Sequence, residues 1–232
     1  MGDDSPLSGR GQTVMLVDAD GTAQDQMDRD REILSRISLW HRPILRLYRI
    51  RSGVTVGRAW SGALPSHWPV LSEGPVVRPT GGGAVLHGSD FCLSLFVPWS
   101  REFPRGQDWL RFYERLHRWI GDGLRESGIL SSEVAVCQDP SGRRGNLPPS
   151  GLCFSEPVRG DRVADGRKIL GGALGLFREG LLYQGSICPP DPSPPLSRLF
   201  EGWYCFQGRV PLEGVLFSER DEDARIEPCG TR

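Results

Sequence analysis

Residues 78–87 read RPTGGGAVLH, and this stretch guides the interpretation of the rest of the chain. Three successive glycines, Gly81, Gly82 and Gly83, let a backbone pass close to a ligand and turn several N–H groups toward an anion or a carbonyl oxygen. Arg78 stands at its edge as a forked donor for phosphate or carboxylate. The GxxxxGK[ST] pattern of a phosphate-binding loop is absent. Taken alone, three glycines favour a tight turn, so a binding role needs support from other segments.

Two later segments add reactive side chains. Residues 153–157 read CFSEP and follow a stretch, 139–151, whose Gly, Pro and Ser content predicts a mobile loop. Residues 165–172 read DGRKILGG and contain Lys168, the single lysine of a chain that otherwise uses arginine. A compact ammonium performs chemistry that a planar guanidinium cannot, which makes Lys168 a candidate for catalysis. The alternatives are a buried structural Cys153 and a solvated lysine in a turn.

The apolar spacing predicts a mixed α+β fold. Residues 23–40 and 107–127 repeat apolar side chains at three- and four-residue steps, as amphipathic helices do. Strands are predicted over 43–50, 54–60, 91–97, 133–137, 167–170 and 181–187, with a strand, a glycine loop and a strand over 75–87. His117 falls on the apolar face of the second helix, where a structural role is expected. Helices mixed with many short strands indicate a layered α+β, or mixed α/β, domain.

Charge, hydropathy and cysteine content argue against several classes of protein. The 232 residues carry 28 basic and 29 acidic side chains, so no global field favours nucleic acid as a partner. No stretch approaches the roughly 18 to 20 apolar residues of a membrane helix, and the N-terminus lacks a secretory pattern. The six cysteines form no CxxC pair and the four histidines no ligand cluster, so no metal is expected. Reduced thiols in a cytoplasmic protein, with no membrane partner, are the expectation.

Taken together, the segments resemble the lipoate–protein ligase and octanoyltransferase family, the lipoyl branch of the biotin/lipoyl protein ligase superfamily. That family shows Arg-Arg-x-Ser/Thr-Gly-Gly-x-Ala-Val-x-His, then Gly-Arg-Lys-Ile-x-Gly-Ser-Ala-Gln, then Leu-His-Gln/His-Gly-Ser-Ile. The corresponding segments here are VRPTGGGAVLH (77–87), GRKILGGA (166–173) and LYQGSI (182–187). Upstream, QMDRD (26–30) is similar to the family's helix and LRLY (45–48) to its strand. The resemblance covers roughly residues 24–190, in the same order.

The chain departs from the family pattern at three positions. Val77 replaces the first arginine of the pair, Leu174 the glutamine after the Gly-Ala segment, and Tyr183 the histidine before Gln-Gly. Each change removes a polar group that is expected near the acyl donor. The departures bear on substrate identity more than on fold.

The resemblance implies a fold and a domain organisation. It predicts a class II synthetase-like mixed β-sheet flanked by helices, with a hydrophobic tunnel for an eight-carbon chain. We expect a disordered polar tail over 1–13 and one biotin/lipoyl ligase-type catalytic domain over 14–190. A Pro-rich C-terminal extension, 191–232, is expected to pack on the same domain.

The resemblance also implies a reaction. A Cys-Phe dipeptide fifteen residues before the lysine is the pattern of the cysteine-dependent octanoyltransferases, with Cys153 as nucleophile and Lys168 as the second catalytic residue. A cation such as Lys168 would raise the thiolate fraction of the cysteine. The implied donor is octanoyl-acyl carrier protein, the acceptor a lysine of a lipoyl domain or glycine-cleavage H-type protein, and no cofactor is needed.

Further residues are implied to bind substrate. Arg78 is expected to position the phosphopantetheine or a nucleotide phosphate, and His87 to shuttle protons or make a structural hydrogen bond. The full set of implied substrate-binding residues is Arg78, Thr80, Gly81, Gly82, Gly83, His87, Gly171, Gly172, Ala173 and Gly185.

Two other functions stay open at this point. An ATP-dependent lipoate–protein ligase core would use ATP and Mg²⁺, and Cys153 would be incidental in it. A non-catalytic acyl- or carrier-binding module is compatible with the changes at Val77, Leu174 and Tyr183, although the presence of both Cys153 and Lys168 speaks against it.

Overall fold

The computed structural model describes residues 12–68, 74–101, 103, 105–129, 135–137, 152–154, 157–164, 167–188, 201, 205–206 and 209–216. Its elements, in chain order, are β1 (Val14–Val17), α1 (Ala23–Arg36), the 3-10 turn η1 (Ile37–Leu39), β2 (Ile44–Tyr48), β3 (Gly53–Val56), β4 (Val76–Val77), β5 (Ala84–His87), β6 (Phe91–Pro98), α2 (Trp109–Glu126), β7 (Ala135–Val136), β8 (Arg162–Ala164), β9 (Arg167–Leu176), β10 (Gly180–Ile187) and α4 (Leu212–Leu216).

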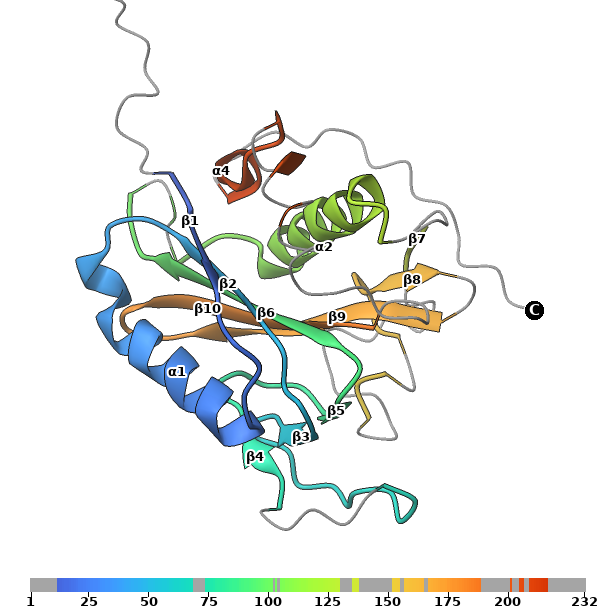
Figure 1. The fold of residues 1–232 in the computed structure, drawn as a ribbon. Helices are drawn as coiled ribbons and strands as arrows, with labels where there is room; N and C mark the ends of the chain where they lie inside the picture. The colour runs from blue at the N-terminus through green and yellow to red at the C-terminus, as the bar shows by residue number, and fades with distance from the viewer. Residues whose placement is uncertain are drawn as a thin grey trace, which may run out of the picture.

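Two sheets organise these strands. The larger has seven strands in the order β1-β2-β6-β10-β9-β8-β7, and the smaller has three in the order β4-β3-β5. Within the larger sheet β1 and β2 are parallel and the other pairs antiparallel, which makes it a mixed sheet. Figure 1 shows the small sheet lying against one end of the large one, beside the N-terminal end of α1.

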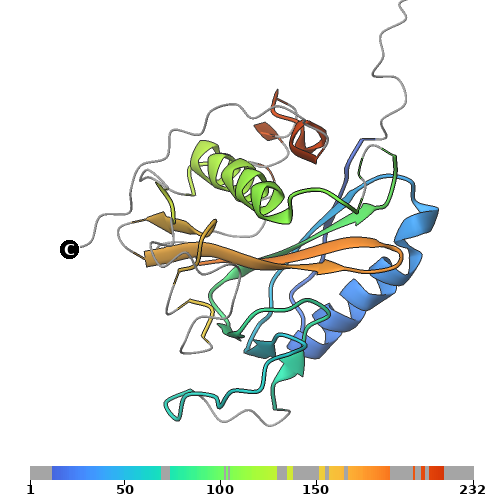
Figure 2. The same ribbon diagram turned by 180° about the vertical axis from the view of Figure 1, so that it is seen from behind.

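The helices cover opposite faces of the large sheet. Figure 1 and the reverse view in Figure 2 place α1 on one face and α2, with α4 above it, on the other. On the α2 face, alternate residues of β6 and β10 join Phe112, Leu116 and Ile120 in the main core. On the α1 face, Phe96 and Leu182 pack against Ile33 and Leu34 in a smaller cluster. Both faces of β6 and β10 are therefore buried, and the expected mixed α/β architecture with a sheet between helices is confirmed.

Local signals explain where the two long helices begin. Thr22 caps α1 through a reciprocal pair of hydrogen bonds with Asp25, and this capping box satisfies free N–H groups of the first turn. Asp108 caps α2 by accepting hydrogen bonds from the backbone of Leu110 and Arg111. The helix predicted over 23–40 ends as an α-helix at Arg36 and continues as η1.

Two strand predictions differ from the structure because of glycines. The strand expected over 54–60 ends at Val56, and the chain then packs against the glycine loop, where a β-carbon on Gly57 would meet the Gly82 carbonyl oxygen at 2.1 Å. The strand expected to stop at residue 170 continues to Leu176, straight through Gly171 and Gly172. Those glycines are strand residues whose missing side chains make room for neighbours, not turn residues.

The ends of the chain are described only in part. The loop predicted over 139–151 and residues 1–11 of the tail predicted over 1–13 lie outside the described residues. Of the C-terminal segment, Phe206, Leu212 and Leu216 are buried in the main core, and the Trp119 indole N–H donates to the Val210 carbonyl oxygen at 2.9 Å. Among the described helices, none combines the length and apolar character needed to cross a membrane.

His117 packs inside the fold and gives it a pH-dependent stability. Its ring is completely buried, and its Nε2 hydrogen-bonds the Tyr183 hydroxyl at 2.7 Å. Burial, aided by the charges of Arg162 and Lys168, lowers the pKa of His117 well below 6.5. The unfolded chain therefore binds a proton near pH 6.5 that the folded chain does not bind, so stability falls as the pH drops below that value.

Replacing His117 with asparagine is expected to remove this part of the pH dependence. Between pH 7.5 and pH 5.5 (roughly one unit either side of the usual histidine value), the free energy of unfolding of the wild type should fall more steeply, by up to about 1.4 kcal/mol per pH unit. Urea unfolding at several pH values measures the difference. Parallel curves for the two proteins would show that His117 also takes up a proton when folded.

Candidate active site

A cavity with about 490 Å³ of empty space, part of which is open solvent, lies between the large sheet, the small sheet and α1. Apolar side chains from α1, β2, β5 and the loop after β2 form part of the wall. Residues of β3, β6, β9, β10, the loop between β4 and β5 and the 152–154 turn form the rest. The lining residues are Met27, Tyr48, Ile50, Thr55, Arg78, Gly82, Val85, His87, Cys92, Cys153, Phe154, Lys168, Gly171, Gly172, Ala173, Gln184, Gly185 and Ser186.

Most of the residues that the sequence indicates meet in this cavity. The expected catalytic pair, Cys153 and Lys168, both line it, as do Arg78, His87 and the glycines at 82, 171, 172 and 185 with Ala173. Thr80, Gly81 and Gly83 stand just behind the lining, in the loop between β4 and β5. Residues 78–87 and residues 153–186, which are more than 60 positions apart in the sequence, are thus brought to one place.

Lys168 is held by a partner that the sequence did not single out. Its Nζ lies 2.7 Å from Oδ2 of Asp161, and the two side chains are 5% and 0% exposed. Asp161 also accepts hydrogen bonds from the Tyr113 hydroxyl at 3.0 Å and from the Val158 backbone at 2.8 Å. Burial raises the pKa of the Asp161 carboxyl, and the ammonium of Lys168 opposes this rise. The pair keeps a positive ammonium in a fixed place at the cavity wall.

Because Gly171 has no side chain, there is room beside it for the side chain of Lys168. A β-carbon on Gly171 would lie 2.2 Å from Cε and 2.6 Å from Nζ of Lys168, and 3.5 Å from Asp161 Oδ1. No such approach is tolerated between real atoms, so the lysine stem occupies the space that the glycine leaves open.

Gly171→Ala is therefore expected to displace the Lys168 ammonium and to lower the acyl transfer that the sequence resemblance implies by about a hundredfold, the usual scale for losing one charge-stabilising donor. Gly106→Ala is the matched control, because nothing lies within 4 Å of a β-carbon at that position. Transfer rates and melting temperatures of the two variants measure the effect. Full activity in the Gly171 variant would mean that the position of Lys168 does not matter.

The 152–154 turn is fastened to the end of the glycine loop. The Cys153 N–H donates to the Ala84 carbonyl oxygen at 3.0 Å, and Leu152 forms a bridge with the same residue. Gly82 has a φ of +93°, a conformation that favours glycine. A β-carbon there would lie 3.8 Å from Cys153 Sγ and 3.1 Å from an Arg78 nitrogen. On the other side of the turn, Lys168 Nζ lies 5.4 Å from the centre of the Phe154 ring.

Arg78 is turned inward, which changes the role expected of it. The residue is only 7% exposed, and its guanidinium donates to the carbonyl oxygens of Gly81 at 3.0 Å and Gly83 at 2.7 Å. The Cys153 side chain is among the groups that face this guanidinium. These contacts use the fork of the guanidinium inside the protein, so the geometry favours Arg78 as a support of the loop and a neighbour of the thiol over an anchor for a solvent-side phosphate.

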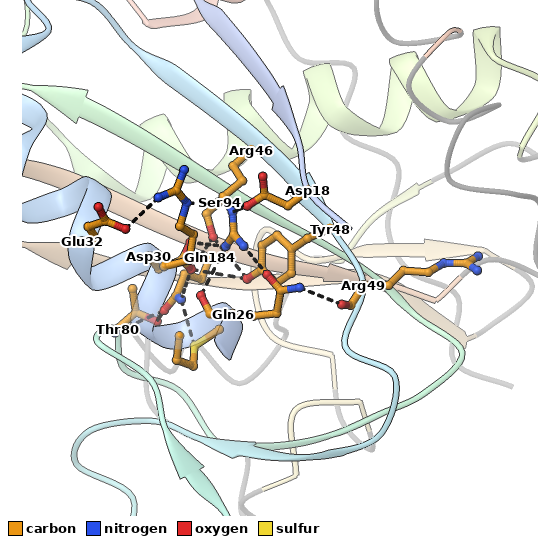
Figure 3. Close-up of polar contacts among 12 residues, drawn as sticks. Asp18, Gln26, Asp30, Glu32, Arg46, Tyr48, Arg49, Thr80, Ser94 and Gln184 are labelled. Carbon is orange, nitrogen blue, oxygen red and sulfur yellow. Dashed lines mark hydrogen bonds and ion pairs between the residues drawn. The ribbon is translucent and has the colours of Figure 1, made fainter. Parts of the chain in front are cut away.

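A buried polar network connects the glycine loop to helix α1. Figure 3 shows the side chains of Asp30, Arg46 and Gln184 converging between α1 and the sheet. Asp30 accepts hydrogen bonds from Arg46, from Ser94 and from Gln184, each at 2.6 Å. The Gln184 side-chain oxygen in turn accepts from the Thr80 hydroxyl at 2.7 Å. Thr80 is completely buried, so it fixes the loop rather than offering a hydroxyl to the cavity.

His87 belongs to a second buried network. Its Nδ1 lies 2.8 Å from Asp90 Oδ2, and its Nε2 lies 2.8 Å from the Thr55 hydroxyl. Asp90 is also bonded by Ser186 and by the thiol of Cys92. Ligand atoms of His87, Asp90 and Cys92 lie within 4.8 Å of one another, the one such group in the described part of the chain. Burial raises the pKa of the Cys92 thiol well above its usual value, so this thiol stays protonated and hydrogen-bonded, a poor match for a metal ion.

The three departures from the family pattern lie away from the cavity. Tyr183 is completely buried on the α2 face, where it meets His117, and Leu174 opposite it packs on the same core. Val77 is 48% exposed on β4. All three residues are described and none lines the cavity, so the expectation that they touch the donor is not supported by their positions.

Comparison with known proteins identifies the family of the chain. The pattern of the lipoyl protein ligase A/B catalytic domain matches residues 22–189. The chain belongs to this family. Among curated members, it is 34% identical over 117 residues to octanoyltransferase LipM of Bacillus cereus, a match that covers 49% of this chain and 41% of that protein. It is 28% identical over 167 residues to octanoyltransferase LipM of Lysinibacillus sphaericus, covering 68% and 59%. The matched part of the chain thus spans about half the length of these relatives.

Solved structures of the family agree on the fold. A lipoate-protein ligase A bound with ATP superposes with a TM-score of 0.61 at 17% identity, covering 87% of this chain and 85% of that one. A putative lipoate protein ligase from T. acidophilum with bound lipoic acid gives 0.59 at 16% identity, covering 87% and 86%. At such identities the likeness establishes the fold, and the predicted ligase-type architecture is confirmed.

Proposed function

We propose that the protein is an octanoyltransferase, which moves an eight-carbon acyl group from a carrier-protein thioester to a lysine of a lipoyl-carrying protein. The observation that carries this proposal is the meeting of Cys153 with the buried ammonium of Lys168 at one cavity. The names of the curated relatives support the same activity.

In the first step, the Cys153 thiolate attacks the carbonyl carbon of the donor thioester. A new carbon–sulfur bond forms, the donor carbon–sulfur bond breaks, and the departing pantetheine thiolate takes up a proton. The oxyanion that develops between these events is stabilised by the Lys168 ammonium and by backbone N–H groups of the glycine loop. Asp161 keeps the ammonium in place, so no reorganisation is needed when the charge appears.

In the second step, the neutral amine of the acceptor lysine attacks the acyl-cysteine. The amide bond forms, the bond to Cys153 breaks, and the amine proton returns to the thiolate or to water. Met27, Ile50, Tyr48 and Val85 give the cavity an apolar wall suited to the hydrocarbon chain. No ATP and no metal take part in either step. We place the donor carrier protein and the acceptor domain at the open side of the cavity.

The test is the donor requirement. The purified protein is incubated with an acceptor lipoyl domain and either octanoyl-acyl carrier protein without ATP or free octanoate with ATP and Mg²⁺. We expect acylation of the acceptor in the first mixture only. Acylation confined to the second mixture would assign the protein as an ATP-dependent ligase, and acylation in neither would leave a binding module.

A further inference from the structure

Thr55 lies at the centre of a chain of hydrogen bonds that ends at Cys153. Its side chain is completely buried on β3 in the small sheet. The hydroxyl is 2.8 Å from an Arg78 nitrogen on one side and 2.8 Å from His87 Nε2 on the other. None of the family motifs quoted above includes this residue, and no catalytic or binding role follows for it from the sequence.

The direction of each hydrogen bond follows from what each group can donate. A guanidinium donates only, so the Thr55 oxygen accepts from Arg78. The hydroxyl proton then points to His87 Nε2, which makes Nε2 an acceptor and leaves the ring proton on Nδ1. That proton is donated to Asp90 Oδ2 at 2.8 Å. Asp90 is fixed further by the Ser186 hydroxyl and by the Gly88 backbone. A carboxylate, an imidazole and a hydroxyl thus orient one arm of the guanidinium.

The other arm of Arg78 lies in the surroundings of the Cys153 thiol. It donates to the carbonyl oxygens of Gly81 and Gly83, and a β-carbon on Gly82 would lie 3.1 Å from its nitrogen and 3.8 Å from Cys153 Sγ. Lys168 lines the same cavity, but its ammonium is engaged by Asp161 at 2.7 Å. The Arg78 guanidinium is therefore a second cation in the surroundings of the thiol.

We propose that Thr55 is a positioning residue for the nucleophile: the Asp90–His87–Thr55 chain holds the Arg78 guanidinium against Cys153 and thereby raises its thiolate fraction. This inference rests on the proposed function in so far as Cys153 is the nucleophile. It assigns to Arg78 the electrostatic effect that the sequence attributed to Lys168.

The charged and titratable groups around this arrangement are few. Cys153 from the turn, Tyr48 from β2 and Cys92 from β6 face Arg78. Burial lowers the pKa of the Arg78 guanidinium, and the Cys153 side chain acts in the opposite direction. Burial raises the pKa of both Tyr48 and Cys92 well above their usual values, so neither competes with Cys153 as an anion near neutral pH.

The test is the rate at which iodoacetamide alkylates Cys153, followed by peptide mass spectrometry across a pH series. Thr55→Val keeps the shape of the side chain and removes the hydroxyl. We expect about tenfold slower alkylation near neutral pH and a pH profile displaced upward by about one unit, because the guanidinium loses a fixed partner. Thr55→Ser, which keeps the hydroxyl, should restore the wild-type profile. A Thr55→Val profile that superposes on the wild type would overturn the inference.

A second variant covers the case in which Thr55→Val does not fold. In Arg78→Lys the positive charge remains but the forked guanidinium is lost. The lysine side chain therefore cannot contact Thr55, the loop carbonyl oxygens and Cys153 at the same time. The same upward displacement is expected, and an unchanged profile would again contradict the inference. Acyl adduct formation by the wild type is measured in parallel. A wild type that forms no adduct but shows the displaced profile in its variants would refute the proposed function and leave the role of Thr55 intact.

Discussion

Lys168→Arg is expected to lower acyl transfer by at least about a hundredfold while the protein remains folded. The charge survives the change, but the compact ammonium does not. The Lys168 side chain occupies the space left by Gly171, and its Nζ lies 2.7 Å from Asp161 Oδ2. A guanidinium is wider and planar, so it cannot occupy the same narrow path and present its charge at the same point.

Transfer rates to a lipoyl-domain acceptor, with circular dichroism and melting temperature as checks on folding, measure this effect. The matched control is Arg167→Lys, which makes the reciprocal change at the adjacent exposed residue and should leave the rate unchanged. Near-normal turnover in the Lys168 variant would show that its ammonium is an ordinary structural cation paired with Asp161.

Cys153→Ser is expected to have the largest effect of all. Serine keeps the size of the side chain but replaces the thiol with a hydroxyl that is almost never ionised near neutral pH. Transfer should fall by on the order of a thousandfold or more, since the nucleophile itself is lost. An enzyme that attacks an acyl-adenylate directly with the acceptor lysine would lose less than about tenfold.

The control for this variant is Cys205→Ser, because Cys205 is an exposed thiol outside the cavity. It should transfer at the wild-type rate. A Cys153→Ser protein that remains fully active and requires ATP would assign the chain to the ligase mechanism.

Much of the site could be predicted because its residues stand in short, recognisable stretches of sequence. Glycines at 81–83 and 171–172 mark places of close approach, and Cys153 and Lys168 stand out by residue type. The helices at 23–36 and 109–126 follow from apolar periodicity, which depends on the near-constant geometry of the helix.

The partners of these residues could not be predicted, because they come from distant strands. Asp161 reaches Lys168 where the pairing of β8 with β9 shifts register near Arg162 and Val163, and no spacing rule locates such an irregularity. Thr55 and Arg78 meet only because β3 pairs with both β4 and β5. The replacement at Tyr183 looked functional in sequence because it stands where the family motif has the histidine before Gln-Gly, and the neighbouring Gln184 does line the cavity. Alternation along β10 sends Tyr183 to the opposite face.

The most direct test of the central claim is the intact mass of the protein after incubation with octanoyl-acyl carrier protein alone, with no ATP and no acceptor. We predict a mass increase of one octanoyl group, carried by the peptide that contains Cys153, absent from Cys153→Ser and discharged when a lipoyl-domain acceptor is added. An unmodified wild-type protein that nevertheless acylates the acceptor when given octanoate and ATP would contradict the claim that Cys153 carries the acyl group.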